Sequence, residues 1–150
     1  MHRVAVAVAV AVTVALAFVV RPASAQSENR WRTQVESQLK NAAKTLSDKG
    51  YEQTHETQIG SLHDDENDSF TLTLHSGTTY ALVGVCDNDC KDLDLVLYDA
   101  DGDQVDSDIQ NDDVPIVQVT PRETQRYRVK VIMANCQTSP CWYGIGVYGK

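Results

Sequence analysis

The residues best suited to do chemistry are the aspartates of the stretch DLDLVLYDADGDQVDSD, residues 92–108, which contains seven of them. If this stretch forms a β-strand, Asp92 and Asp94 project from the face opposite Leu93 and Leu95, so their carboxylates lie side by side. Carboxylates this close repel each other, and calcium relieves the repulsion because it binds carboxylate oxygens. Two interpretations stay open: a calcium site, or an acidic strand face that is only solvated.

Two more aspartates, Asp87 and Asp89, lie in the loop before this strand and are candidates to complete a calcium site. Farther along the chain, Asp99, Asp101 and Asp103 have the spacing of the first ligands of an EF-hand loop. That loop also needs a glycine and a closing glutamate at positions where this sequence has Gln104 and Gln110, and no flanking helices are expected here. These three aspartates therefore predict a turn.

Apart from its acids, the sequence offers little for catalysis. Beyond residue 25 the only histidines are His55, His63 and His75, and no GxSxG, HExxH, phosphate-loop or CxxC motif occurs. An enzyme needs a nucleophile, a base and an orienting group that converge, and no such set is visible. We therefore predict a protein that is not an enzyme.

The chain contains four cysteines, Cys86, Cys90, Cys136 and Cys141. An even number in an exported chain predicts two disulfides. A zinc site is the alternative, but zinc ligands are often spaced as CxxC, whereas these pairs are spaced as Cx3C and Cx4C. Each neighbouring pair spans a short polar loop, so we expect Cys86 to bond Cys90 and Cys136 to bond Cys141. The two crossed connectivities stay open.

Residues 1–25 have the form of a secretory signal peptide. A basic start, Met1–Arg3, precedes the apolar run Val4–Val20, and Ala23–Ala25 has the small-x-small form that signal peptidase reads. We expect cleavage before Gln26, export to the periplasm or the exterior, and no membrane attachment of the mature chain. An uncleaved anchor is the alternative, because the apolar run lies at the short limit for a spanning helix.

The mature chain is strongly acidic. Cleavage removes two of the 13 basic residues, Arg3 and Arg21, which leaves 11 against 21 acidic residues and changes the net charge from −8 to −10. Eleven aspartates and one base, Lys91, lie between Asp87 and Asp113. This distribution argues against nucleic acid or an anionic membrane as partner. A protein or glycan with a cationic or neutral surface fits better.

Residues 26–50 form an N-terminal segment in which residues 27–49 are expected to make one amphipathic helix, capped by Ser27 and stopped by Gly50. The apolar positions recur at helical spacing and are Trp31, Val35, Leu39, Ala42, Ala43 and Leu46. We expect this stripe to dock onto the domain that follows. A dimer or partner helix is the alternative.

From residue 51 to residue 150 the periodicity is two, which is typical of β-strands. Asp101-Gly102 is a hairpin turn signal. The expected strands lie within residues 52–59, 69–74, 78–86, 92–98, around 105, and within 116–120, 127–133 and 142–148. About eight short antiparallel strands predict a mainly β fold, a jelly-roll-like β-sandwich preceded by one α-helix.

Several segments fit a known pattern: Ser69–Leu72, the turn and strand at Gly77–Tyr80, the motif DLDLxLYDxxG from Asp92 to Gly102, and Tyr127–Val129. Their order resembles the bacterial pre-peptidase C-terminal domain, a sandwich related to the collagen-binding modules of clostridial collagenases. Two features depart from that pattern: this sequence contains no peptidase domain, and the family pattern does not include the four cysteines.

The resemblance implies a non-catalytic accessory module, which in several relatives is stabilised by calcium or binds a polymer. It also adds calcium candidates, because Asp64, Asp65, Glu66 and Asp68 resemble the acidic linker that supplies ligands in the collagen-binding relatives. We therefore expect an exported binding module of the cell envelope or exterior that recognises a protein or glycan. The alternative is a structural protein that oligomerises through its N-terminal helix.

Overall fold

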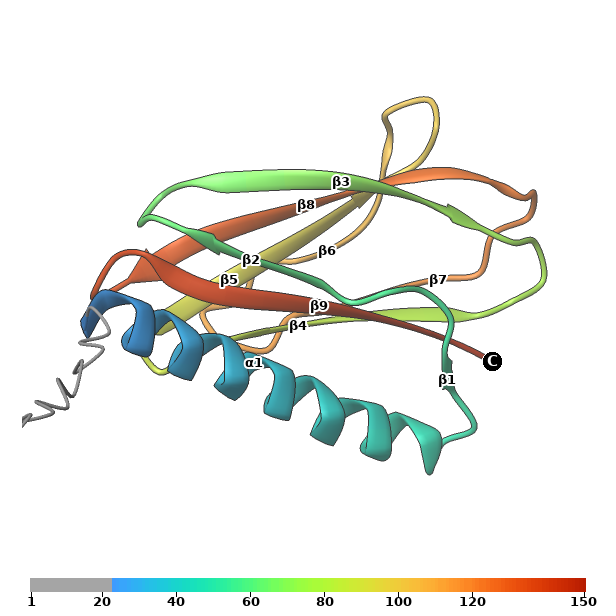
Figure 1. The fold of residues 1–150 in the computed structure, drawn as a ribbon. Helices are drawn as coiled ribbons and strands as arrows, with labels where there is room; N and C mark the ends of the chain where they lie inside the picture. The colour runs from blue at the N-terminus through green and yellow to red at the C-terminus, as the bar shows by residue number, and fades with distance from the viewer. Residues whose placement is uncertain (1–22) are drawn as a thin grey trace, which may run out of the picture.

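The computed structural model describes residues 23–150, with side chains from residue 29 onward, as one helix packed against a two-layered β-structure (Figure 1). The elements in chain order are α1 (Ala23–Ser47), β1 (Glu52–Gln53), β2 (Gln58–Leu62), β3 (Asn67–Leu74), β4 (Tyr80–Cys86), β5 (Cys90–Tyr98), β6 (Gln104–Asp108), β7 (Ile116–Val119), β8 (Gln125–Cys136) and β9 (Cys141–Gly149).

The strands form two antiparallel sheets. Sheet A has the order β1-β9-β4-β7, with β2 also pairing with β9, and sheet B has the order β3-β8-β5-β6. The predicted mainly β sandwich is confirmed. The single weak strand expected within residues 52–59 is instead two strands, because β1 and β2 pair with successive parts of β9.

The core lies between the two sheets and is built by the inward positions of alternating strands. Its fully buried members include Leu74, Leu82, Leu93, Leu95, Leu97, Val117, Val129, Val131, Met133 and Ile145. Each such side chain contributes about 1.5 to 3 kcal/mol through burial. Phe70, on the same face of the edge strand β3 as Leu74, is only partly buried.

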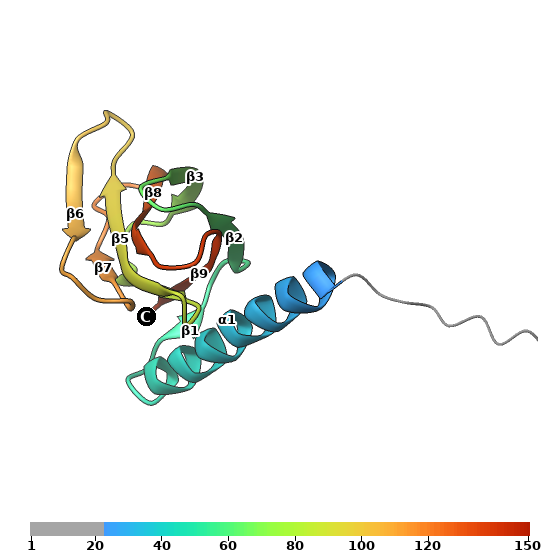
Figure 2. The same ribbon diagram turned by 90° about the vertical axis from the view of Figure 1, so that its left-hand side faces the viewer.

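Helix α1 lies across the outer face of sheet A (Figures 1 and 2). Val35 and Leu39 are buried there against Val85. Gly144 of β9 makes this close approach possible: a Cβ at that position would lie 2.6 Å from Cγ1 of Val35 and 2.7 Å from Cδ1 of Leu39. The predicted docking of the apolar stripe is confirmed. Trp31 is the exception, since it is half-buried under the guanidinium of its neighbour Arg30.

The bounds of the helix differ from the prediction. It begins at Ala23, so Ser27 lies inside it and is not its N-cap, because the alanines of this segment favour helix. Gly50 does stop it: its φ is 83°, and the N–H of Tyr51 donates to the carbonyl of Leu46. The signal peptide prediction falls mostly on residues 1–22, outside the described residues. No helix within residues 23–150 is long and apolar enough to cross a membrane.

The edge formed by β6 and β7 is closed by side chains. Asp108 Oδ2 accepts the backbone N–H of Ile116 at 2.9 Å, and Asp106 Oδ2 accepts that of Gln118 at 2.7 Å. These carboxylates occupy edge donors of sheet A that would otherwise be open to another strand. Figure 2 shows β6 and β7 side by side at one edge of the sandwich.

Candidate functional site

Asp87 is a structural carboxylate. It is 1% exposed, and its Oδ2 accepts the backbone N–H of Trp142 at 2.7 Å. Its Oδ1 accepts the N–H groups of Asp89 and Cys90 at 3.1 and 3.3 Å. Three backbone donors thus take up the oxygens that the sequence analysis assigned to calcium, and Asp87 ties the loop after β4 to β9.

The acidic loop between β2 and β3 is also held by hydrogen bonds. Asp64 Oδ1 accepts the N–H of Cys136 at 2.6 Å, and Glu66 Oε2 accepts the N–H of His63 at 2.9 Å. Asp65 has a φ of 61°, as expected of a turn residue. Glu66 thus holds the loop itself, and Asp64 ties it to the end of β8.

Asp68, the last acid of this segment, accepts a hydrogen bond from the hydroxyl of Tyr143 at 3.1 Å. Burial of the phenol, together with the negative charge and the hydrogen bond of Asp68, raises the pKa of Tyr143 well above its usual value. Tyr143 therefore stays a hydrogen-bond donor at physiological pH.

Asp92 and Asp94 form the one predicted carboxylate pair with unfilled hydrogen-bonding capacity. Oδ1 of each is buried and has no hydrogen-bond partner within the described residues. Burial raises the pKa of both carboxyls. For Asp94 the charges of Asp92, Asp108 and Asp112 add to the effect, whereas for Asp92 a hydrogen bond from the backbone of Asp112 partly offsets it and the charge of Asp112 adds to it. Buried carboxylate oxygens without donors are costly, which is the condition that a bound cation would relieve.

The sequence analysis did not include Asp108 and Asp112 among the candidates. Asp108 lies opposite Leu95 in the β5–β6 pairing, and the carbonyl of Asp112 accepts the N–H of Leu93 at 2.9 Å. The hairpin turn at Asp101-Gly102 was visible in the sequence, but the register that brings Asp108 toward Asp94 was not. Within residues 23–150 no three His, Cys, Asp or Glu side chains are arranged to hold a metal ion.

Changing Asp94 to asparagine is expected to stabilise the protein in the absence of calcium. The raised pKa means that the folded state pays a penalty for ionised Asp94. That penalty is present above the folded-state pKa and disappears as pH falls toward the ordinary value of 3.8. Urea melts of parent and D94N in a chelator should therefore differ most near neutral pH and converge near pH 4. Equal stability of the two proteins at pH 7 would contradict the buried cost.

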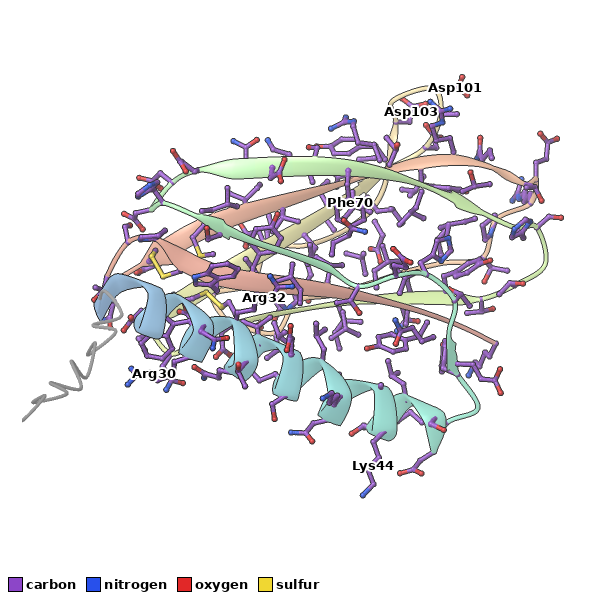
Figure 3. All side chains as sticks on the ribbon, in the orientation of Figure 1. Arg30, Arg32, Lys44, Phe70, Asp101 and Asp103 are labelled. Carbon is purple, nitrogen blue, oxygen red and sulfur yellow. A yellow bond between two sulfur atoms is a disulfide. The ribbon has the colours of Figure 1, made fainter. Side chains whose placement is uncertain are left out.

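The two disulfides have the local connectivity. The sulfurs are 2.00 Å apart in Cys86–Cys90 and 2.11 Å apart in Cys136–Cys141. Because Cys90 and Cys136 are partners in the β5–β8 pairing, the two bonds lie beside each other at one end of the sandwich. Figure 3 shows them close to the first turns of α1, where Gln34 donates to Asn88 of the Cys86–Cys90 loop at 2.6 Å.

The outer face of sheet B carries a basic stripe, defined as Arg126, Arg128 and Lys130 of β8. Alternate residues of a strand share a face, so the three side chains lie in one row. Within the described residues none of them forms an ion pair. The stripe accounts for three of the 11 basic residues beyond residue 25. Its alternation is readable in the sequence RYRVK, but the sequence analysis did not use it.

Hydroxyl and aromatic groups flank the basic stripe. In the β3–β8 pairing, Ser69, Thr71 and Thr73 lie opposite Lys130, Arg128 and Arg126, respectively. On the other side, the Arg128 guanidinium carbon lies 4.0 Å from the ring centroid of Tyr98. An open groove of about 480 Å³ runs from this row to the β5–β6 turn. It is lined by Thr71, Asp99, Ala100, Asp101, Gly102, Arg126, Tyr127 and Arg128.

His55 anchors a loop. Nε2 of His55 lies 3.0 Å from the carbonyl of Thr73, and Nδ1 lies 2.9 Å from Oγ1 of Thr54. These contacts tie the β1–β2 connection to the end of β3. Thr54 also donates to a backbone carbonyl, that of Val147. This arrangement is that of a loop anchor.

No protein-family model matches the sequence. No curated protein matches it either. Among solved structures, the chain is similar to the crystal structure of the pre-peptidase C-terminal domain of collagenase from Bacillus anthracis, with 16% sequence identity and a TM-score of 0.49. The match covers 61% of this chain and 87% of that chain. The likeness is one of fold, and it is to the domain family that the sequence resembles.

Proposed function

We propose that this chain is an exported, non-catalytic binding module of the cell envelope or exterior that recognises a protein or glycan through the outer face of sheet B. The observation that carries the proposal is the unequal use of the two outer faces. Helix α1 covers that of sheet A, whereas that of sheet B bears a basic stripe that forms no ion pair within residues 29–150. Two disulfides support an oxidising compartment.

The chemistry of this face indicates the kind of partner. Arginine and lysine donate to carboxylates and hydroxyls, threonine hydroxyls donate and accept, and an aromatic ring flanked by arginine stacks on flat groups. A polymer rich in hydroxyl or carboxylate groups, such as a glycan or an exposed polypeptide, offers the matching acceptors. The sequence analysis expected a partner with a cationic or neutral surface. The neutral one fits this face better, because the basic stripe would repel a cationic surface.

The alternative of assembly through the N-terminal helix has less support. Val35 and Leu39 are buried against the same chain, and Ala42, Ala43 and Leu46 pack on the cluster that contains Tyr148. The apolar stripe that an oligomer would use is therefore already occupied.

Calcium enters the proposal as a stabiliser at the Asp92–Asp94 pair. The support is the two buried carboxylate oxygens, which have no hydrogen-bond partner in the described part of the chain, beside the charges of Asp108 and Asp112. Such an ion would take oxygens of both carboxylates and complete its shell with water. A ligand at one hundred times its dissociation constant adds about 2.7 kcal/mol to stability.

The melting temperature of the metal-stripped protein should therefore rise on addition of millimolar calcium. This increase should be absent in the double variant D92N/D94N. Magnesium is the control, because it demands a smaller and more regular shell. If calcium neither shifts the melt nor produces heat by titration calorimetry, these aspartates are surface residues and the cofactor proposal is wrong.

The binding proposal is tested by the double variant Arg128→Glu/Lys130→Glu on arrays of glycans and extracellular matrix polymers. Against a ligand of the parent, this variant should lose at least about tenfold in affinity, because two donors become repelling acceptors. The matched control is Lys40→Glu/Lys44→Glu on the exposed face of α1, which changes net charge equally. Equal losses in both variants would mean that only net charge matters and would contradict the assignment.

A further inference from the structure

The exposed large apolar side chains of the described residues all lie in one short segment. They are Val105, Ile109, Val114 and Ile116, with exposed fractions of 41, 67, 45 and 44%. Single exposed apolar residues are ordinary on protein surfaces, but a group of them indicates an interaction surface. The four residues belong to β6, β7 and the loop between them, here called the β6–β7 edge, residues 104–119.

The fold brings the two strands of this segment together. Asp108 of β6 accepts the N–H of Ile116 of β7, so Ile109 and Ile116 flank the same hydrogen bond. Pro115 is buried between Val114 and Ile116, which leaves these two side chains on the open side. Figure 2 shows this edge on the side of the sandwich away from most of α1, which packs on β9, β4 and β1.

Aspartates lie along this segment, from the β5–β6 turn at one end of β6 to the β6–β7 loop at the other (Figure 2). Residues 99–113 contain seven aspartates and no basic residue. Asp103, Asp112 and Asp113 are exposed, and Figure 3 shows Asp101 and Asp103 at the tip of the β5–β6 turn. A second copy of the chain would meet this surface with the same acidic charge, so self-association is opposed by repulsion.

We propose that the β6–β7 edge docks a cationic peptide segment in which lysine or arginine alternates with apolar residues. The apolar side chains would cover Ile109, Val114 and Ile116, and the basic ones would reach the surrounding aspartates. The N–H groups of Ile116 and Gln118 already donate to Asp108 and Asp106. The peptide would therefore be held by side-chain contacts rather than by pairing with β7 as an added strand. This surface adjoins sheet B at its β6 edge, and it takes a cationic partner, whereas the basic stripe takes a hydroxyl- or carboxylate-rich one.

The probe is an amidated ten-residue peptide of alternating lysine and leucine, titrated into the purified protein and followed by amide chemical shifts. We expect the largest shifts within residues 104–119. In the variant Ile109→Ser/Ile116→Ser, the affinity for the peptide should fall at least about tenfold. An isoleucine side chain that the peptide buries completely would by itself account for about a tenfold change in affinity or more. In Asp113→Lys it should fall about fivefold, as for one rim charge.

Matched controls separate this docking from non-specific attraction. Ser37→Ala/Asn41→Ala, two exposed changes on α1, should leave the affinity unchanged, and thermal melts of every variant establish that the fold is intact. Equal binding of a lysine–serine peptide, or equal affinity in Ile109→Ser/Ile116→Ser, would overturn the proposal. So would a dimer of the parent that Ile109→Ser/Ile116→Ser dissociates in sedimentation, because the edge would then serve a second copy.

Discussion

Replacing Leu39 with aspartate is expected to lower the free energy of unfolding by about 4 kcal/mol, because it removes a buried leucine and places a charge in an apolar contact. Leu39 is 5% exposed and packs with Val35 and Val85 between α1 and sheet A. In the folded protein the aspartate would meet Gly144, which offers no donor side chain. Urea denaturation followed by tryptophan fluorescence and by circular dichroism measures the change.

The control for this substitution is Ser37→Asp, which adds the same charge to an exposed position of the same helix. It should change stability by less than about 0.5 kcal/mol. If Leu39→Asp and Ser37→Asp unfold at the same urea concentration, the helix contributes nothing to the sandwich, and α1 is a free segment available to a partner.

Replacing Asp87 with alanine should cost about 3 kcal/mol, because hydrogen bonds to a charged acceptor are strong and three backbone N–H groups would lose theirs. The loss should also loosen the Cys86–Cys90 loop from β9, since Asp87 Oδ2 holds the N–H of Trp142. Denaturation in chelator and in millimolar calcium should give the same loss, which separates a structural carboxylate from a metal ligand.

Asp89→Ala is the matched control, because the Asp89 carboxylate accepts no hydrogen bond within the described residues, and its stability should stay near that of the parent. A loss in Asp87→Ala that appears only when calcium is present would return Asp87 to the set of metal ligands and contradict its structural role.

The sequence was sufficient for the elements that repeat a simple period. The buried positions Leu93, Leu95 and Leu97 and the apolar stripe of α1 follow from periods of two and 3.6 residues. The start of α1 could not be predicted in the same way, because the alanine-rich sequence around a cleavage signal also favours a helix. Local loops between cysteines likewise favoured the pairing that the structure has.

The candidate site was less predictable because it depends on contacts between distant segments. Asp87 has the same residue type as Asp92, yet its neighbours are three backbone N–H groups supplied by β9 and its own loop, which no local pattern announces. The approach of Asp108 to Asp94 depends on hairpin register. The sequence shows where the carboxylates are, but only the folded structure shows which hydrogen-bond donors each of them contacts.

Amide chemical-shift mapping with the tightest ligand from the polymer arrays locates the binding surface residue by residue. Binding through the outer face of sheet B predicts shifts along β8 and its neighbours β3 and β5, centred on Arg128 and Thr71, with α1 unaffected. Shifts confined to α1 and β2, or to the β6–β7 edge, with none at Arg126, Arg128 or Lys130, would contradict the assignment of that face as the binding surface.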